Sequence, residues 1–195
     1  MSNCVSLPGS LKEGAISKPL RVVLTGSECT GKSTLADMLA AHYEVPCVHE
    51  FLRDYFIDHD GVLTLDDAIP IVKGQLASED SVETAVSDAD IPVMLFDTNA
   101  LSSVVYNKYY YGTNPEWIEQ AFADRNYTLY FLCGIDVPWQ ADGQRDRPQE
   151  REYLQSLFRN ELIARDLPFI ELNGDVTERF SHAVSLIDLL LKNAC

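Results

Sequence analysis

The stretch that decides the fold is GSECTGKST, residues 26–34, which lies between the apolar run RVVLT (21–25) and the amphipathic segment LADMLAAHY (35–43). It matches the pattern G-x-x-x-x-G-K-[ST], whose two glycines adopt backbone conformations that a β-carbon would obstruct. Successive amide groups of such a loop point inward at phosphate oxygens, and the following helix directs its positive end at the same anion. We therefore predict a phosphate-binding loop, the P-loop, between a strand and a helix.

The positions within the P-loop predict its ligand. Lys32 is expected to place its ammonium group on the β and γ phosphates of ATP, and Ser33 is expected to bind Mg²⁺. The backbone around them would supply N–H donors to the remaining phosphate oxygens. We predict that ATP contacts the whole loop, which consists of Gly26, Ser27, Glu28, Cys29, Thr30, Gly31, Lys32, Ser33 and Thr34.

The composition of the chain limits the classes of function. Its 195 residues, 46% of them hydrophobic, suffice for one substantial core. The formal net charge of −15 makes attraction to nucleic acid or to an anionic membrane unfavourable, so neither is an expected partner. The five scattered cysteines show neither zinc-site spacing nor a disulfide framework. Because no signal peptide or membrane span is evident either, we expect a soluble protein of the reducing cytoplasm, and the sequence leaves its oligomeric state open.

Apolar runs and segments of helical periodicity alternate along the chain. Most of the apolar runs lack polar alternation, as expected of strands that are buried on both faces of a parallel sheet. They occupy residues 21–25, 46–49, 92–96, 128–132 and 168–172. This alternation predicts the α/β class, with a doubly wound parallel sheet of about five strands and ligands at the carboxyl ends of the strands, as in P-loop nucleoside and nucleotide kinases.

The organisation predicted from these patterns is simple. We expect a single domain over residues 21–195, preceded by a flexible N-terminal arm over residues 1–20 that is rich in Gly, Pro and Ser. Residues 63–86 also follow a helical pattern. Thr64 is a candidate cap for this helix, and Pro70 is expected to interrupt or kink it.

A second acidic position follows a buried-type strand. The run PVMLFDT (92–98) carries Asp97 at its end, where P-loop enzymes need a carboxylate that binds Mg²⁺ or acts as a base. The alternative is that Asp97 caps the following segment. The presence of the P-loop upstream favours the metal-binding or catalytic role.

Two further segments could contact a small acceptor. HEFLRDYF (49–56) supplies Glu50, Arg53 and Tyr55, although the pattern by itself favours an ordinary helix start with a solvated Glu/Arg pair. The stretch 104–117 contains four tyrosines that could stack on a base, but packing of a helix onto the sheet is the favoured interpretation. These tyrosines are Tyr106, Tyr109, Tyr110 and Tyr111.

An arginine-rich segment follows the fourth predicted strand. Residues 140–151 contain Arg145, Arg147 and Arg151 in a chain otherwise dominated by acidic residues. Arginines on a mobile lid can close over a triphosphate, stabilise charge on the transferring phosphoryl group and exclude water. The alternative is a solvated loop with ion pairs inside the segment.

Taken in order, these motifs resemble the ribosylnicotinamide kinase domain of NadR-type proteins over nearly all of the chain after Arg21. The P-loop resembles the family's G-x-E-x-[ST]-G-K-S pattern. The positions that match outside the glycines and lysine are Glu28 and Thr30, Glu50 and Arg53, Gln75, Asp97 and Thr98, and Trp139, Asp142, Gly143 and Arg145. His49 departs from the family, because a larger aromatic that stacks on a pyridinium ring is expected there.

The resemblance implies transfer of the γ-phosphoryl group of ATP to the 5′-hydroxyl of nicotinamide riboside. Together with the P-loop and the strand that ends at Asp97, it supports catalytic roles for Lys32, Asp97 and Arg145 and Mg²⁺ ligands in Ser33 and Asp97. The arginine-rich segment adds a predicted ATP contact from Arg147. The implied acceptor-binding residues are His49, Glu50, Arg53, Gln75, Asp97 and Thr98. Because only the segment before Arg21 precedes the P-loop, we expect the kinase without the nucleotidyltransferase and DNA-binding domains of full-length members.

Two other functions remain open from the sequence. A nucleoside or nucleotide kinase with a purine or pyrimidine acceptor would carry the same motifs. A P-loop ATPase that acts as a regulatory switch would need no acceptor pocket, and its output would be a conformational change that a partner recognises.

Overall fold

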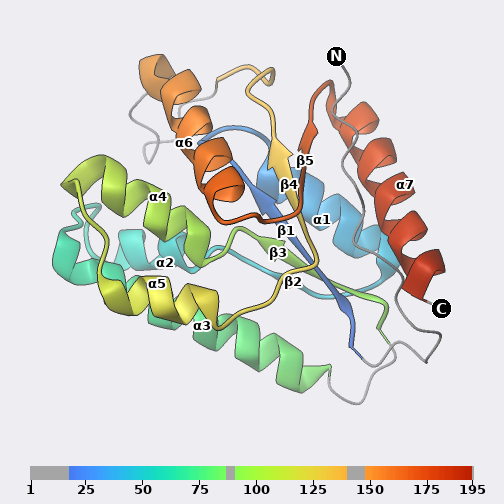
Figure 1. Ribbon diagram of the computed structural model, residues 1–195, viewed down its shortest axis with the longest axis horizontal. Helices are drawn as coiled ribbons and strands as arrows, with labels where there is room; N and C mark the ends of the chain where they lie inside the picture. Colours follow the sequence, from blue (N-terminus) through green and yellow to red (C-terminus); the bar gives the residue numbers. More distant parts are fainter. Residues whose placement is uncertain (1–17, 87–90, 140–147, 195) are drawn as a thin grey trace.

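The computed structural model describes residues 18–86, 91–139 and 148–194 (Figure 1). Its centre is one sheet of five parallel strands in the order β2-β3-β1-β4-β5. The strands are β1 (Leu20–Thr25), β2 (Cys47–Val48), β3 (Val93–Asp97), β4 (Leu129–Cys133) and β5 (Phe169–Leu172). The predicted α/β class with a five-stranded parallel sheet is confirmed. Leu20, which we assigned to the N-terminal arm, is instead the first residue of β1.

Helices connect the strands and cover both faces of the sheet. They are α1 (Lys32–Tyr43), α2 (Phe51–Asp58), α3 (Ala68–Ala85), α4 (Ala100–Tyr111), α5 (Glu116–Ala123), α6 (Arg151–Ala164) and α7 (Val176–Ala194), together with the 3₁₀ turns η1 (Leu65–Asp67) and η2 (Pro148–Glu150). Helices α1 and α7 cover one face, and α3 to α6 cover the other (Figure 1). Within the described ranges, no helix is long and apolar enough to cross a bilayer.

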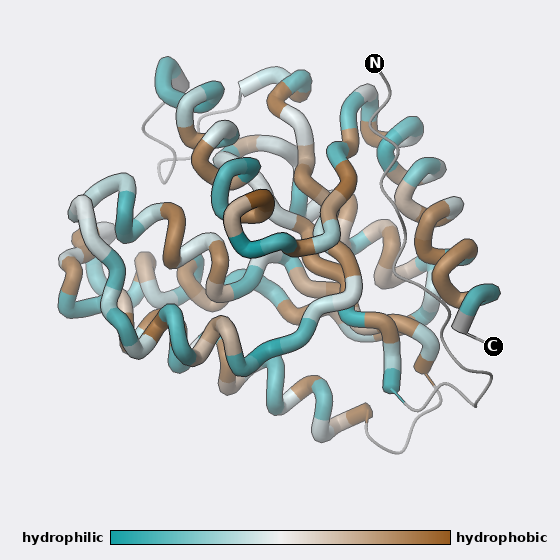
Figure 2. The backbone as a smooth tube through the Cα atoms, viewed as in Figure 1, coloured by the Kyte–Doolittle hydropathy of each residue, from teal (hydrophilic) through white to brown (hydrophobic). Residues whose placement is uncertain are grey.

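Each face of the sheet has its own hydrophobic core. Along β1, Val23 packs in the core beneath α3 to α6, whereas Val22 and Leu24 pack in the core beneath α1 and α7. Successive side chains of a strand point to opposite faces, so a strand between two helical layers must be apolar throughout. Figure 2 shows hydrophobic segments in the central strands and more hydrophilic segments along the outer helices.

Pro70 does not interrupt the helical segment, contrary to our expectation. It lies in the first turn of α3, where backbone N–H groups have no acceptor within the helix. Thr64 precedes η1, and its backbone N–H and hydroxyl donate to the carboxylate of Asp67 at 2.8 and 2.9 Å. The prediction of Thr64 as a cap is confirmed, although it caps the short turn before α3 rather than α3 itself.

The sheet topology brings the two sequence motifs together. The P-loop follows the carboxyl end of β1, and Asp97 ends the neighbouring strand β3, where it lies in register with Leu24. The backbone N–H of Thr98 then donates to the carbonyl of Leu24 at 3.0 Å. Because both strands are parallel, the P-loop and Asp97 lie at the same edge of the sheet.

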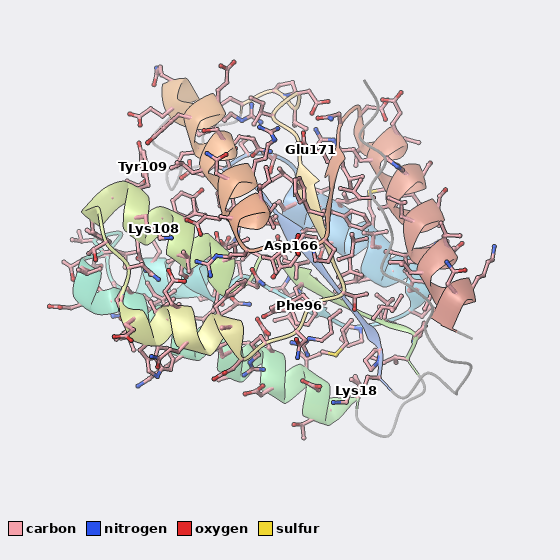
Figure 3. All side chains as sticks on the ribbon, in the orientation of Figure 1. Lys18, Phe96, Lys108, Tyr109, Asp166 and Glu171 are labelled. Atoms are coloured by element: carbon pink, nitrogen blue, oxygen red, sulfur yellow. The ribbon has the colours of Figure 1, made fainter. Side chains whose placement is uncertain are left out.

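Far from this edge, a buried carboxylate links α3 to the start of β1. The side chain of Glu79 is fully buried, accepts a hydrogen bond from Tyr127 at 2.9 Å and pairs with Arg21 at 3.0 Å. Arg21 in turn lies 4.7 Å from the ring centre of Phe96, which Figure 3 labels near the centre of the molecule. Burial raises the pKa of Glu79 to about 7, against the opposing effects of Tyr127 and Arg21.

This pKa predicts a pH dependence of stability. Because the folded state raises the pKa, the contribution of Glu79 is most favourable below its ordinary pKa of 4.5 and is lost as the pH rises through about 7. We expect the free energy of unfolding of the wild type to fall relative to that of Glu79→Gln between pH 5 and pH 7.5. Urea unfolding of both proteins across this range measures the difference, and parallel pH profiles would contradict it.

Candidate active site

Three residues of the P-loop have positive φ angles, which determine how its backbone turns. Gly26 has φ 127°, Gly31 has φ 77°, and Cys29 between them has φ 57°. A β-carbon on Gly26 would lie 2.9 Å from the carbonyl oxygen of Cys133, so this position accepts only glycine. The two glycines confirm the conformational reason for the motif, whereas the left-handed backbone of Cys29 carries no sequence signal.

Lys32 binds two backbone carbonyl groups of its own loop. Its ammonium group donates to the carbonyl oxygens of Gly26 at 3.0 Å and Ser27 at 2.8 Å. The next residue, Ser33, accepts a hydrogen bond of 3.3 Å from the guanidinium of Arg53. Lys32, Ser33 and Arg53 therefore converge at the amino-terminal end of α1, where the helix dipole favours an anion.

Helix α6 supports the P-loop from behind. The side-chain carbonyl of Gln155 accepts the backbone N–H of Ser27 at 2.9 Å, and its amide donates to the carbonyl of Cys133 at 2.9 Å. Arg151 donates to the carbonyls of Cys29 and Val137, both at 2.7 Å. We had assigned Arg151 to a lid or a solvated loop; it is instead the first residue of α6 and is bound to the P-loop backbone.

Arg179 of α7 supports the same loop from the other side. Its guanidinium is buried and donates to the carbonyl of Thr30 at 2.7 Å and to that of Gly134 at 3.1 Å. It also donates to the carbonyl of Gly174 at 2.9 Å and pairs with Asp136. Sequence analysis missed both Gln155 and Arg179, because nothing in their local patterns distinguishes them from other polar helix residues.

Asp97 and Thr98 are buried at the carboxyl end of β3. Their exposed fractions are 2% and 3%, and Asp97 Oδ1 and Thr98 Oγ1 have no hydrogen-bond partner. Thr98 has φ 73°, an uncommon conformation for a β-branched residue. Buried polar atoms without partners are rare in native proteins, so these two mark a place where a ligand supplies the missing bonds.

A cavity of about 330 Å³ opens directly beside the P-loop. Its walls come from the P-loop, α2 with the turn after it, the start of α3, and one side of α4. The lining residues are Glu28, Cys29, Lys32, Glu50, Leu52, Arg53, Phe56, Gly61, Leu63, Thr64, Ala68, Ile71, Ser102, Ser103, Tyr106, Asn107, Tyr110 and Tyr111. This volume lies at the lower end of the range that is typical of small-molecule sites, about 300–1,000 Å³.

Two of our favoured interpretations hold only in part at this cavity. Core packing explains Tyr106 only in part, since it contacts Phe158 at 5.7 Å between ring centres and also lines the cavity; Tyr110 and Tyr111 are exposed there. The Glu50–Arg53 pair, at 2.9 Å, lines the cavity rather than a solvated helix face.

Glu50 is a largely buried charged group in the cavity wall, with 14% of its side chain exposed. Burial raises the pKa of this carboxyl, and the positive charges of Lys32 and Arg53 oppose the shift. His49, its neighbour in sequence, is exposed and does not line the cavity.

The other predicted positions are distributed as follows. Gln75 is 4% exposed and accepts the backbone N–H of Phe51 at 2.9 Å, and Thr34 is exposed on α1. The guanidinium carbon of Arg151 lies 5.9 Å from the centre of the Trp139 ring. The proposed lid residues Arg145 and Arg147, with Asp142 and Gly143, lie outside the described residues.

The support of the P-loop by Arg179 can be tested. Arg179→Met leaves three backbone carbonyls without a donor, so we expect the free energy of unfolding to fall by about 2–5 kcal/mol. We also expect at least a tenfold loss of affinity for a nucleoside triphosphate, measured by calorimetry at a temperature where the variant is folded. Arg159→Met is the matched control, because its ion pair with Glu171 is about 38% exposed and such pairs contribute about 0–1 kcal/mol. An Arg179 variant that binds the triphosphate like the control would contradict this role.

The sequence is similar to that of a curated protein. The chain is 27% identical to the trifunctional NAD biosynthesis/regulator protein NadR of Escherichia coli over 173 residues, which cover 85% of this chain and 41% of NadR. It thus spans less than half the length of this curated relative. The resemblance to NadR-type proteins that the motifs indicated is confirmed.

Solved structures show the same fold. A NadR protein in complex with NR matches with a TM-score of 0.70 and 22% identity, over 90% of this chain and 50% of that one. A NadR protein in complex with NAD and AMP-PNP matches with a TM-score of 0.68 and 22% identity, over 90% and 49%. Thymidylate kinase from Ehrlichia chaffeensis matches with a TM-score of 0.63 and 13% identity, over 87% and 98%.

These matches share the five-stranded parallel sheet, so the fold is that of the P-loop nucleoside and nucleotide kinases. The family model that matches the sequence is described as an AAA domain, and it covers residues 21–179, from the first residues of β1 to Arg179 in α7. The chain therefore belongs to this AAA domain family of P-loop proteins.

Proposed function

We propose that this protein is a kinase that transfers the γ-phosphoryl group of ATP to the 5′-hydroxyl of a nucleoside, with nicotinamide riboside as the first candidate. One observation carries the proposal: Lys32 of the P-loop lines the same cavity as Glu50, Arg53 and the tyrosines of α4. A phosphate donor on the P-loop would thus face a second compound in a cavity of nucleoside size. A switch ATPase would need no such cavity.

The residues present suit ATP and Mg²⁺. The P-loop supplies N–H donors, the ammonium of Lys32 and the start of α1, and the relative in complex with AMP-PNP supports a triphosphate there. Ser33 and Asp97 are the oxygen ligands that would hold Mg²⁺, and Asp97 Oδ1 has no other partner. The bound ion would neutralise charge on the phosphate oxygens during transfer.

The side chains of this site would divide the remaining work. Lys32 leaves the carbonyls of Gly26 and Ser27 for the β and γ phosphates, since an ammonium binds an anion more strongly than a neutral carbonyl. Asp97 orients or deprotonates the acceptor hydroxyl, or holds the metal. Arg145 and Arg147, on the proposed lid, neutralise charge on the transferring group and exclude water.

The cavity also suits a cationic acceptor. Its wall combines two carboxylates, Glu28 and Glu50, with aromatic rings of which Tyr110 is 42% exposed. Tyrosine faces attract cations, whereas the positive charges of Lys32 and Arg53 in the same wall offset the negative charges of the two carboxylates, so the attraction comes from the rings. The tyrosines could therefore supply the stacking surface that His49 does not supply from its exposed position, which supports a pyridinium riboside as acceptor.

The role of Lys32 is testable by its removal. Lys32→Ala eliminates the ammonium that contacts the transferring phosphate, so we expect kcat to fall by at least about a hundredfold. The circular dichroism spectrum and thermal midpoint should stay close to those of the wild type. Lys192→Ala, an exposed lysine in the last turn of α7, is the control for loss of charge. Turnover at the wild-type rate in Lys32→Ala would remove the triphosphate from this loop.

The acceptor can be identified by mass spectrometry. The purified protein is incubated with ATP, Mg²⁺ and a nucleoside panel that includes nicotinamide riboside, and each acceptor is examined for the mass of one added phosphoryl group. We expect phosphorylated nicotinamide riboside. Phosphorylation of another nucleoside instead would replace the acceptor, whereas ATP hydrolysis with no phosphorylated acceptor would support the switch ATPase.

A further inference from the structure

A small polar subpocket, which we call the alcove, adjoins the main cavity, and the proposed mechanism does not use it. It has a volume of about 10 Å³ and shares Glu50, Leu52, Ile71, Ser102 and Ser103 with the cavity wall. Its remaining lining residues are Gln75, Thr98 and Asn99. A space of this size holds about one water molecule or one hydroxyl group.

Two of these side chains present unpartnered polar atoms although they are more than nine-tenths buried. Gln75 is 4% exposed and Thr98 is 3% exposed, and Gln75 Nε2 and Thr98 Oγ1 have no hydrogen-bond partner. The orientation of the Gln75 amide is fixed, because its oxygen must accept the backbone N–H of Phe51 at 2.9 Å. Its NH₂ group is therefore left as a donor without an acceptor. Desolvating a donor in this way costs free energy, which a ligand recovers when it supplies the partner.

The alcove combines both kinds of hydrogen-bonding group. Gln75 Nε2 only donates, the carboxylate of Glu50 only accepts, and the hydroxyl of Thr98 does either. A hydroxyl group of a ligand both donates and accepts, so it satisfies these side chains together. A carboxylate would meet the negative charge of Glu50, and an apolar group would leave Gln75 Nε2 and Thr98 Oγ1 unpaired.

The alcove lies beside Asp97, and this position indicates which part of an acceptor would enter it. Thr98 follows Asp97 directly, whereas the aromatic wall of Tyr106, Tyr110 and Tyr111 lies on α4 in the larger cavity. If the reacting hydroxyl lies at Asp97 and the base lies against the tyrosines, the sugar ring lies between them. The group in the alcove is then attached to that ring rather than to the base.

On the basis of the proposed function, we infer that this alcove binds a ring hydroxyl of the acceptor's ribose and makes the enzyme selective for ribonucleosides over deoxyribonucleosides. Gln75 and Thr98 are the specificity-determining residues. A deoxyribonucleoside leaves Gln75 Nε2 and Thr98 Oγ1 buried and unpaired, which is the arrangement that discriminates most strongly against a missing hydroxyl.

The test compares the best ribonucleoside acceptor with its 2′-deoxy and 3′-deoxy analogues. For the wild type, we expect kcat/KM to be at least about tenfold lower for one of the two analogues. In Thr98→Val, which keeps the shape of the side chain, the ribonucleoside should lose this advantage while the discriminated analogue is little affected. Thr84→Val is the matched control, because Thr84 is exposed on α3 and should leave the ratio unchanged.

Two further measurements separate recognition from folding. Thr98→Val should unfold at a urea concentration no lower than that of the wild type, because the deleted hydroxyl is buried without a partner in the free protein. Gln75→Met, which lacks the donor, should weaken calorimetric binding of the ribonucleoside in the absence of ATP and leave binding of the deoxy analogue unchanged.

The outcomes distinguish this inference from the function on which it rests. Equal kcat/KM for the ribonucleoside and both deoxy analogues in the wild type would overturn the inference and leave the kinase activity standing. So would a Thr98→Val protein that keeps the wild-type ratio, since the alcove would then hold a structural water. Wild-type protein that neither binds nor phosphorylates any nucleoside overturns the proposed function and the inference with it.

Discussion

Several backbone carbonyl groups of the P-loop are bound by hydrogen-bond donors from side chains. Three cationic side chains supply them: Lys32 from the loop itself, Arg151 from α6 and Arg179 from α7. The chain has only 15 Lys and Arg residues against 30 Asp and Glu residues, so three cations around one loop are a marked concentration. Arg151 and Arg179 bind the loop backbone from two different helices, and Lys32 is the cation that the proposed mechanism moves to the phosphates. The rest of the site depends on this one arrangement.

The register between β1 and β3 determines where the side chain of Asp97 lies. Along β3, Leu95 packs beneath α1 and α7, and Phe96 packs beneath α3 to α6. Because the side-chain period of a strand is two, a shift of one residue would turn Asp97 to the other face of the sheet. The pairing of Asp97 with Leu24 prevents this shift, because in this register the apolar residues 22–24 of β1 and 93–96 of β3 are all fully buried. The two cores thus set the side of the sheet on which Asp97 lies.

Sequence reasoning succeeded where the signal is local and failed where it is not. The P-loop and the strands could be predicted, because their patterns extend over a few consecutive residues. Gln155 and Arg179 could not, since they contact Ser27 and Thr30 across 128 and 149 positions of the chain. The tyrosines of α4 were predicted only in part. Their spacing indicates one face of a helix, but whether part of this face borders a cavity depends on where α2 and the turn after it lie in the fold.

The buried polar groups of this protein differ in whether they have hydrogen-bond partners. Some of them are paired: Glu79, far from the site, accepts a hydrogen bond from Tyr127, and Asn99 donates to the hydroxyl of Tyr130 at 3.0 Å. At the carboxyl ends of the strands, Asp97 and Thr98 are buried with equally little exposure and still carry unpartnered atoms. Each such atom costs about 1–3 kcal/mol when no partner is present. A ligand that supplies partners for Asp97 Oδ1 and Thr98 Oγ1 recovers this cost, so binding there would add to the stability of the folded protein.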